Sequence, residues 1–145
     1  MEKIRKKIQE LTRQYGTCEL DELCEKMGII TIDQELPERV NGFTVKMYEI
    51  SFIVLNKALS FYEKRLTKAH ELGHIVLHNG TNTLNLSCNT SFCVTKYEKE
   101  ADCFAAMLLI QSEMSELEGL DSVTAETVSR LTHIPQEIVD RALMI

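Results

Sequence analysis

The sequence has no run of about 20 apolar residues, so no transmembrane helix is expected. Its first residues, 1–7, are rich in charge and lack the apolar core of a signal peptide. Internal repeats and low-complexity segments are also missing. With 145 residues, the chain is expected to form a single domain, 1–145, that is large enough to bury its own core.

The chain also lacks an excess of basic residues. It has 16 Lys and Arg but 22 Asp and Glu, which gives a net charge of −6. This balance argues against direct nucleic-acid binding through phosphate neutralisation. It is compatible with a basic partner or simply with solubility. Five cysteines without a secretion signal indicate reduced thiols in a cytoplasmic protein. Cys88 and Cys93 have no second pair nearby, which favours packing or surface thiols over a second metal site.

The segment 70–74 reads His-Glu-Leu-Gly-His and fits H-E-x-x-H, a motif of zinc peptidases. Positions i and i+4 of a helix share one face, so the rings of His70 and His74 converge on one ion, expected to be Zn²⁺. Glu71 lies close enough to act as general base on a metal-bound water without being a ligand. The alternative is a pair of helix histidines that are merely satisfied by hydrogen bonds.

The motif lies in a segment that is expected to be a helix from 60 to 78. Ser60 and Glu63 fit the S-x-x-E capping box at its start, and Asn79-Gly80 is a good stop. Gly73 costs about 1 kcal/mol relative to alanine inside a helix. Its use favours the close approach of another backbone, and a tolerated defect is the alternative.

A third zinc ligand is expected on a second helix, residues 96–111. The apolar stripe of this helix leads back by helical steps to Glu98, and Asp102 follows one turn later on the same face. Glu100 points about 200° away from Glu98. The sequence therefore predicts Glu98 as third ligand and Asp102 as the carboxylate that orients a ligand histidine. Glu100 is the fallback ligand, and a solvated first turn is the alternative for both acidic residues.

These two motifs, residues 69–78 and 98–109, resemble the ImmA/IrrE family of zinc metallopeptidases, as does the strand 53–56 before the first motif. The resemblance covers about residues 30–112. The family usually continues with Met-Pro, where this chain has Ile110-Gln111. Family members are cytoplasmic and zinc-dependent, are often encoded on phages or mobile elements, and include anti-repressors that cleave a helix-turn-helix repressor. The resemblance carries the ligand role to His70, His74 and Glu98, and the general-base role to Glu71.

The expected fold is α+β: a small, zincin-like sheet packed on the two motif helices, with extra helices at both ends. The expected strands are 29–32, 40–47 and 50–55, with Tyr48-Glu49 as a hairpin turn, and the expected terminal helices are 1–15, 19–27, 124–132 and 135–144. The C-terminal extension, 113–145, either packs under the core or forms a small lid. Strand 50–55 is interpreted as the edge to which an extended substrate adds, and the polar segment 81–95 as a loop over the site.

The resulting hypothesis is a zinc-dependent, site-specific endopeptidase that cleaves a helix-turn-helix repressor. A non-catalytic zinc module that binds such a repressor is the competing class, and an interaction protein that has kept the fold is a third. Glu71 argues against a structural zinc site, because such a site needs no base. His78 is interpreted as a satisfied surface histidine or an outer partner of the site. Tyr48, Tyr62 and Tyr97 are more often packing residues than oxyanion stabilisers.

Overall fold

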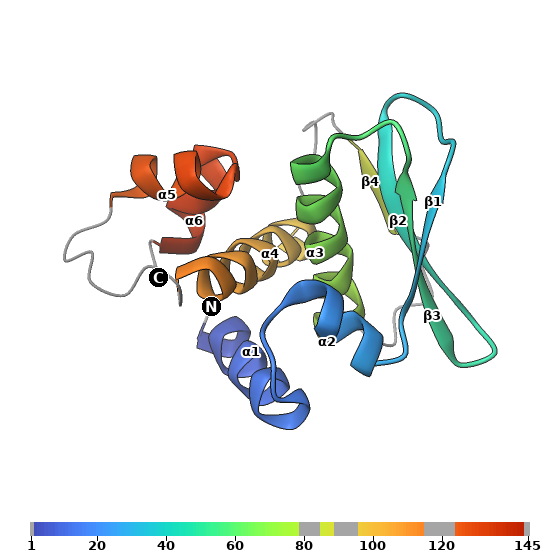
Figure 1. The fold of residues 1–145 in the computed structure, drawn as a ribbon, viewed down its shortest axis with the longest axis horizontal. Coiled ribbons are helices and arrows are strands. Elements are labelled where there is room, and N and C mark those ends of the chain that lie inside the picture. Colours follow the sequence, from blue (N-terminus) through green and yellow to red (C-terminus); the bar gives the residue numbers. More distant parts are fainter. Residues whose placement is uncertain (1, 79–84, 89–95, 115–123, 144–145) are drawn as a thin grey trace.

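The computed structural model describes residues 2–78, 85–88, 96–114 and 124–143. These residues form helices and a small mixed sheet, with helices on both sides of the strands in the sequence, which confirms the expected α+β class (Figure 1). The helices are α1 (Glu2–Tyr15), α2 (Leu20–Lys26), α3 (Phe61–Leu77), α4 (Lys96–Met114), α5 (Ala125–Thr132) and α6 (Gln136–Leu143). The strands are β1 (Ile30–Gln34), β2 (Val40–Met47), β3 (Ile50–Asn56) and β4 (Asn85–Cys88).

The strands of the sheet lie in the order β1-β3-β2-β4. β1 runs parallel to β3, whereas β2 is antiparallel to both β3 and β4. The hairpin between β2 and β3 turns at Tyr48 and Glu49, as predicted, and both residues have positive φ angles of 51° and 66°. Two consecutive positive φ angles are the signature of a type I′ turn, whose twist matches that of the strands it joins.

The interpretation of strand 50–55 as an open edge is wrong. In the sheet, Ile53 of β3 pairs with Thr31 on one side and with Thr44 on the other. Its backbone groups are therefore used within the sheet and are not available to a substrate.

The polar segment 81–95 is not wholly a loop, because residues 85–88 form β4 beside β2. The rest of that segment lies outside the described residues.

Helix α3 begins where the sequence predicted. The Ser60 hydroxyl accepts a hydrogen bond from the Glu63 N–H at 3.3 Å, and the Ser60 N–H donates to the Glu63 carboxylate at 3.2 Å. This capping box satisfies two backbone donors at the start of the helix. From there α3 runs between the sheet and α4 (Figure 1).

Gly73 lies where α3 and α4 approach each other closely, which confirms the expected backbone contact. A Cβ atom at this position would lie 3.2 Å from Ala101 Cα and 3.2 Å from Phe104 Cβ. Both neighbours are fully buried in the core. Helix α4 ends at Met114, three residues beyond the predicted end at 111, because the chain has no proline there to stop it.

The terminal helices belong to the same hydrophobic core as the motif helices. Ile4 and Ile8 of α1, and Val139 and Ala142 of α6, are buried in one cluster with residues of α3 and α4. The C-terminal helices therefore pack on the core through α4, which decides a question that the sequence left open. The hydrophobic core thus includes residues on both sides of the range 30–112 that carries the family resemblance.

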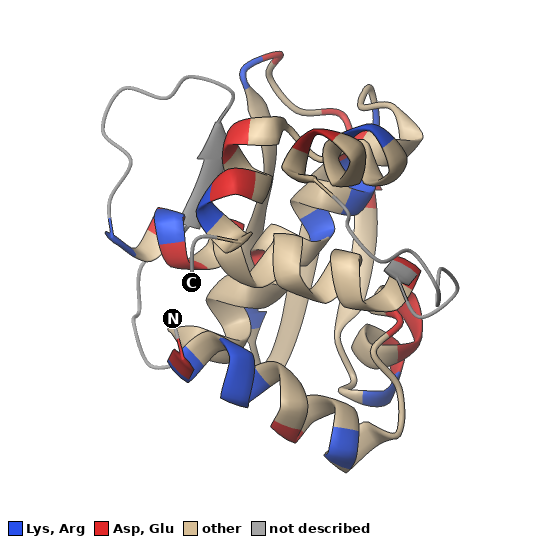
Figure 2. Ribbon diagram, turned by 90° about the vertical axis from the view of Figure 1, so that its left-hand side faces the viewer, with Lys and Arg blue, Asp and Glu red and all other residues tan. Residues whose placement is uncertain are grey.

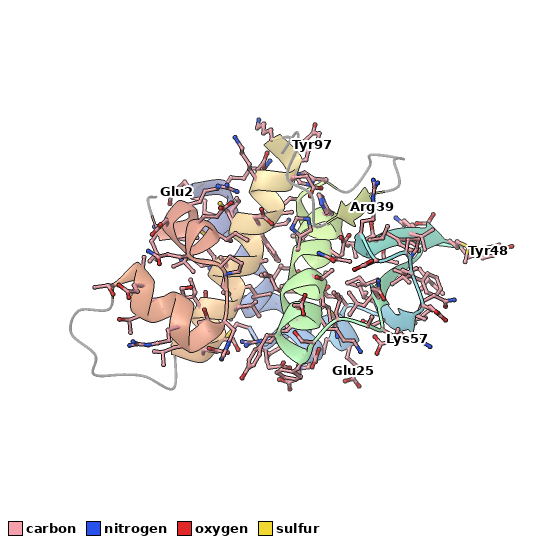
Figure 3. The ribbon with its side chains drawn as sticks, turned by 90° about the horizontal axis from the view of Figure 1, so that it is seen from above. Glu2, Glu25, Arg39, Tyr48, Lys57 and Tyr97 are labelled. Carbon is pink, nitrogen blue, oxygen red and sulfur yellow. The ribbon has the colours of Figure 1, made fainter. Side chains whose placement is uncertain are left out.

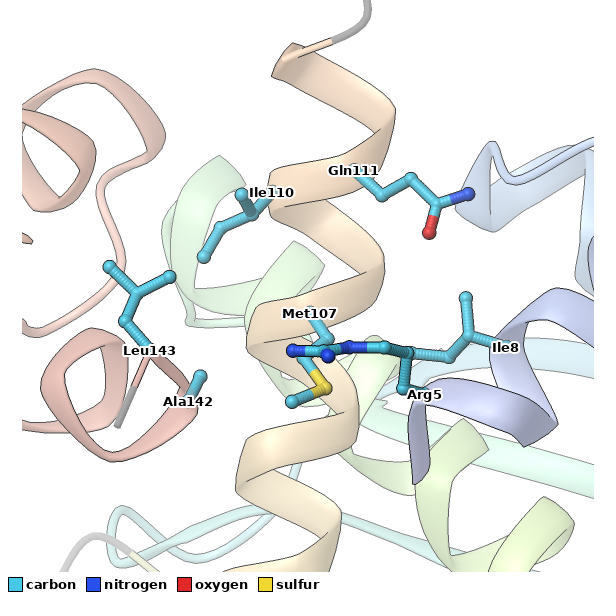
Figure 4. Close-up of a pocket in the computed structure, with 7 residues that line it drawn as sticks. All are labelled: Arg5, Ile8, Met107, Ile110, Gln111, Ala142 and Leu143. Atoms are coloured by element: carbon cyan, nitrogen blue, oxygen red, sulfur yellow. The ribbon is translucent and has the colours of Figure 1, made fainter. Parts of the chain in front are cut away.

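The helices α1, α4 and α6 meet around a cavity of about 180 Å³ (Figure 4). Met107 and Ile110 line it from α4, Ala142 and Leu143 from α6, and Arg5 from α1.

None of the described helices is long and apolar enough to cross a membrane.

Replacing Gly42 of β2 by alanine is expected to destabilise the protein. The added Cβ would lie 2.6 Å from the Val54 carbonyl oxygen and 3.1 Å from Thr67 Cγ2 of α3. Because the first of these atoms belongs to the backbone of β3, the strands must shift, at a cost of about 1–3 kcal/mol. Urea denaturation would measure the loss. Asn41→Ala, at the neighbouring half-buried position, serves as control, and an equal loss in both variants would contradict the steric explanation.

Candidate metal centre

Three side chains from two helices meet between α3 and α4. His70 and His74 are one turn apart on α3, and their Nε2 atoms lie 3.2 Å from each other. Glu98, in the first turn of α4, has Oε2 at 3.0 Å from His70 Nε2 and Oε1 at 2.8 Å from His74 Nε2. The sequence-predicted helix phase thus brings Glu98, and not Glu100, to the two histidines. Among the described residues, these three are the group whose donor atoms lie close enough to hold one metal ion.

The donor set fits a zinc ion in both chemistry and spacing. Two imidazole nitrogens and one carboxylate oxygen are the protein ligands of many catalytic zinc sites. Tetrahedral bonds of about 2.1 Å place donor atoms roughly 3.4 Å apart. The three residues offer one donor atom each, and these atoms all lie within 4.8 Å of one another, so small shifts of the side chains would bring them to this spacing around an ion.

The outer nitrogen of His70 is held by Asp102. The Nδ1–H of His70 donates a hydrogen bond of 2.7 Å to Asp102 Oδ1, so Nε2 is the nitrogen that faces Glu98. Burial disfavours the charged imidazole, but the hydrogen bonds to Asp102 and Glu98 outweigh it and raise the pKa of His70 to about 10. Burial by itself raises the pKa of Glu98. The hydrogen bonds to both histidines outweigh this effect and hold the pKa of Glu98 well below the usual range. The structure thus places the Asp102 carboxylate against the outer nitrogen of His70.

The outer nitrogen of His74 is held in a similar way by His78. Their Nδ1 atoms are 3.1 Å apart, and both rings are buried. Burial, together with the neighbouring charge of His74, lowers the pKa of His78. A neutral His78 accepts the hydrogen bond from the His74 Nδ1–H, which leaves His74 Nε2 directed at Glu98.

Glu100, the fallback ligand, faces away from the group: its Oε2 is 3.9 Å from His78 Nε2 and 4.0 Å from Lys3 Nζ.

Glu71 is fully buried on α3, next in sequence to His70, and its negative charge contributes to the raised pKa of that histidine.

Three tyrosines are candidate oxyanion stabilisers, and they lie in different parts of the structure. Tyr97, at the start of α4, has its ring centroid 4.5 Å from that of His78 (Figure 3). Tyr62 stacks on His133 at 3.7 Å, and Tyr48 projects from the far tip of the hairpin. Of these three tyrosines, Tyr97 is thus the one with a ring contact to His78, the histidine that is bonded to His74.

The charges around the centre come from several elements. Basic and acidic residues recur along α1, which begins beside the first turns of α4 (Figure 2). A cavity of about 510 Å³ lies between these two helices and is lined by Lys3, Lys96, Lys99 and Glu100.

Three of the cysteines, Cys18, Cys24 and Cys103, are free thiols, and burial raises the pKa of Cys24 to about 11. A thiol held neutral in this way is a poor metal ligand.

Sequence reasoning missed one residue of this network, Arg141 of α6. Its Nη1 lies 3.5 Å from Asp102 Oδ2. The two residues are 39 positions apart, and the amphipathic pattern of a short helix gives no signal for such a contact. Only the packing of α6 on α4 reveals it.

Comparisons with known proteins agree with this geometry. The profile of the M78 peptidases, described as the IrrE N-terminal-like domain, matches residues 24–144. "Uncharacterized immunity region protein 2" of Bacillus phage phi105 is 30% identical over 135 residues, which cover 93% of this chain and 85% of that protein. "Metallopeptidase ImmA" of Bacillus subtilis (strain 168) is 26% identical over 144 residues, 97% of this chain and 83% of that protein. No solved structure matches the chain. Together with the two motifs, these matches show that the chain belongs to the ImmA/IrrE family of metallopeptidase-like proteins, the M78 peptidases.

Proposed function

We propose that this protein is a zinc-dependent, site-specific endopeptidase that cleaves a helix-turn-helix transcriptional repressor in the cytoplasm. The observation that carries the proposal is the convergence of His70, His74 and Glu98, with Glu71 beside them on α3. The two relatives, one named a metallopeptidase and the other a phage immunity region protein, support the reaction and the setting. Since the net charge is −6, we expect the protein to act on the repressor itself and not on its DNA.

In this proposal His70, His74 and Glu98 hold the zinc ion, and Asp102 and His78 fix the two imidazole rings. Three protein ligands leave one coordination position open, as catalytic zinc sites require. The bound ion would supply Lewis-acid chemistry, which polarises a carbonyl and makes water a better nucleophile at neutral pH.

Glu71 is the proposed proton carrier of the reaction. Its carboxylate takes a proton from the attacking water and later gives it to the nitrogen of the leaving amine. Full burial supports this role, because a carboxylate that is shielded from bulk solvent exchanges protons only with what enters the site. A base is of no use to a purely structural zinc site, which favours the enzyme over a zinc-containing interaction module.

The substrate is expected to bind as an added strand at the edge formed by β4. β3 is enclosed by its neighbours, and β1, the other edge among the described strands, meets α3 at the ion pair Asp33–Lys64, in the first turn of that helix and before the two histidines. β4 contacts α3, the helix that carries the histidines. Backbone hydrogen bonds to an edge strand give affinity that depends little on side chains. Recognition of the repressor outside the cleaved segment would then supply the specificity.

The purified protein is expected to bind about one equivalent of zinc, and His70→Ala is expected to lose most of it. Removing a ligand should weaken binding by more than the roughly 10–100-fold that loss of an outer partner costs. Elemental analysis and competition with a chromophoric chelator would measure this. The control is His133→Asn, because His133 stacks on Tyr62 outside the group. Unchanged metal content in His70→Ala would refute the ligand assignment.

Glu98→Gln should weaken zinc binding far more than Glu100→Gln. The two residues are matched in type and helix, but only Glu98 has oxygens within 3.0 Å of both histidines. The same chelator competition distinguishes them. A larger loss in Glu100→Gln would mean that the third ligand has been assigned to the wrong glutamate.

Glu71→Gln should keep zinc and partner binding but reduce cleavage by at least about 100-fold, since it removes the base and leaves the ligands. The zinc-loaded protein and this variant would be incubated with a helix-turn-helix repressor whose gene neighbours its own and, separately, with unfolded casein. Mass spectrometry would identify the products. Rapid digestion of casein with the repressor left intact would sink the specificity claim. Cleavage by Glu71→Gln at the wild-type rate would sink the mechanism.

A further inference from the structure

The C-terminal helix α6 reaches the candidate metal centre through one side chain. Asp102 of α4 uses both carboxylate oxygens: Oδ1 accepts the hydrogen bond from His70 Nδ1–H at 2.7 Å, and Oδ2 lies 3.5 Å from Arg141 Nη1. One carboxylate therefore connects a helix near the end of the chain to a proposed zinc ligand on α3.

We propose that Arg141 is a positioning residue of the metal centre, which acts through Asp102 to hold His70 in its metal-binding orientation. The inference rests on the proposed function, because it concerns how the same three ligands are kept in place. Helix α6 lies outside both sequence motifs, and the inference gives it a part in metal binding.

The need for such a residue follows from the freedom of an aspartate side chain. The terminal torsion of Asp is broad, so a single hydrogen bond to one oxygen leaves the plane of the carboxylate free to swing. A second contact at the other oxygen fixes that plane and, with it, the ring that donates to it. Arginine suits this task because its guanidinium is planar, carries several donors and stays charged at all physiological pH values.

The contact is more than an exposed surface pair. The side chains of Arg141 and Asp102 are 29% and 24% exposed, and that of His70 is 10% exposed, so solvent screens them less than it screens charges on the surface. The position of Arg141 is also determined by its own helix. Its neighbours Val139 and Ala142 are buried against the core, and Glu137 Oε1 lies 3.9 Å from Arg141 Nη2 one turn earlier.

Zinc affinity, measured by chelator competition, is the readout, and the central variant is Arg141→Gln. We expect an affinity loss of about tenfold, the lower end of the roughly 10–100-fold range for outer partners of metal ligands. Arg141→Lys keeps the charge but loses the planar fork, so its loss should be smaller. The matched control is Arg130→Gln, on the exposed side of α5, which should bind zinc like the wild type. Urea denaturation of the metal-free proteins would show whether each variant keeps its fold.

A double-mutant cycle with Asp102→Asn separates a positioning role from a general loss of stability. If Arg141 acts through Asp102, Arg141→Gln should cost nothing further in the Asp102→Asn background. An equal loss in both backgrounds would overturn the inference, as would wild-type affinity in Arg141→Gln. Should Arg141→Gln fail to fold, Arg141→Lys takes its place in the cycle with the same two outcomes. Failure of the wild-type protein to bind zinc would instead overturn the proposed function, and this inference with it.

Discussion

The approach of α3 to α4 at Gly73 is the contact on which the candidate metal centre depends. With no side chain at this position, the backbone of α4 comes close enough that a Cβ atom would lie only 3.2 Å from Ala101 Cα. His70 and His74 flank Gly73 on α3, and Glu98 precedes Ala101 on α4 by three residues. The distances between histidine and carboxylate therefore depend on how closely the two helices pack. A packing contact in the core thus controls the geometry of a polar site beside it.

Burial of two imidazole rings imposes a second requirement, because each ring has two nitrogens that need partners. The inner nitrogens of both rings face Glu98, and the outer nitrogens are bonded to Asp102 and to His78. This arrangement selects one ring orientation for each histidine before any metal binds. Such preorganisation lowers the entropic cost of assembling a metal site, which is why loss of an outer partner weakens metal affinity by roughly 10–100-fold.

The sheet has a supporting role that follows from its strand order. β3 lies between β1 and β2 and carries buried residues, Ile53 and Leu55, in the core that also contains α3. A central strand makes a firm base for the motif helix, but it offers no free backbone groups to a substrate. In the proposed function, an extended peptide therefore binds at an edge of the sheet and not at β3.

The sequence by itself determined the features that depend on near neighbours. The capping box at Ser60, the shared face of His70 and His74, and the phase that selects Glu98 over Glu100 all follow from helical spacing, which acts within a few residues. Tertiary structure alone decided the central position of β3, the pairing of β4 with β2, and the contact of Arg141 with Asp102. Those features join segments that lie far apart in the chain, and their energies depend on how the whole core packs. Local periodicity carries no information about that, because the same amphipathic pattern is compatible with many partners.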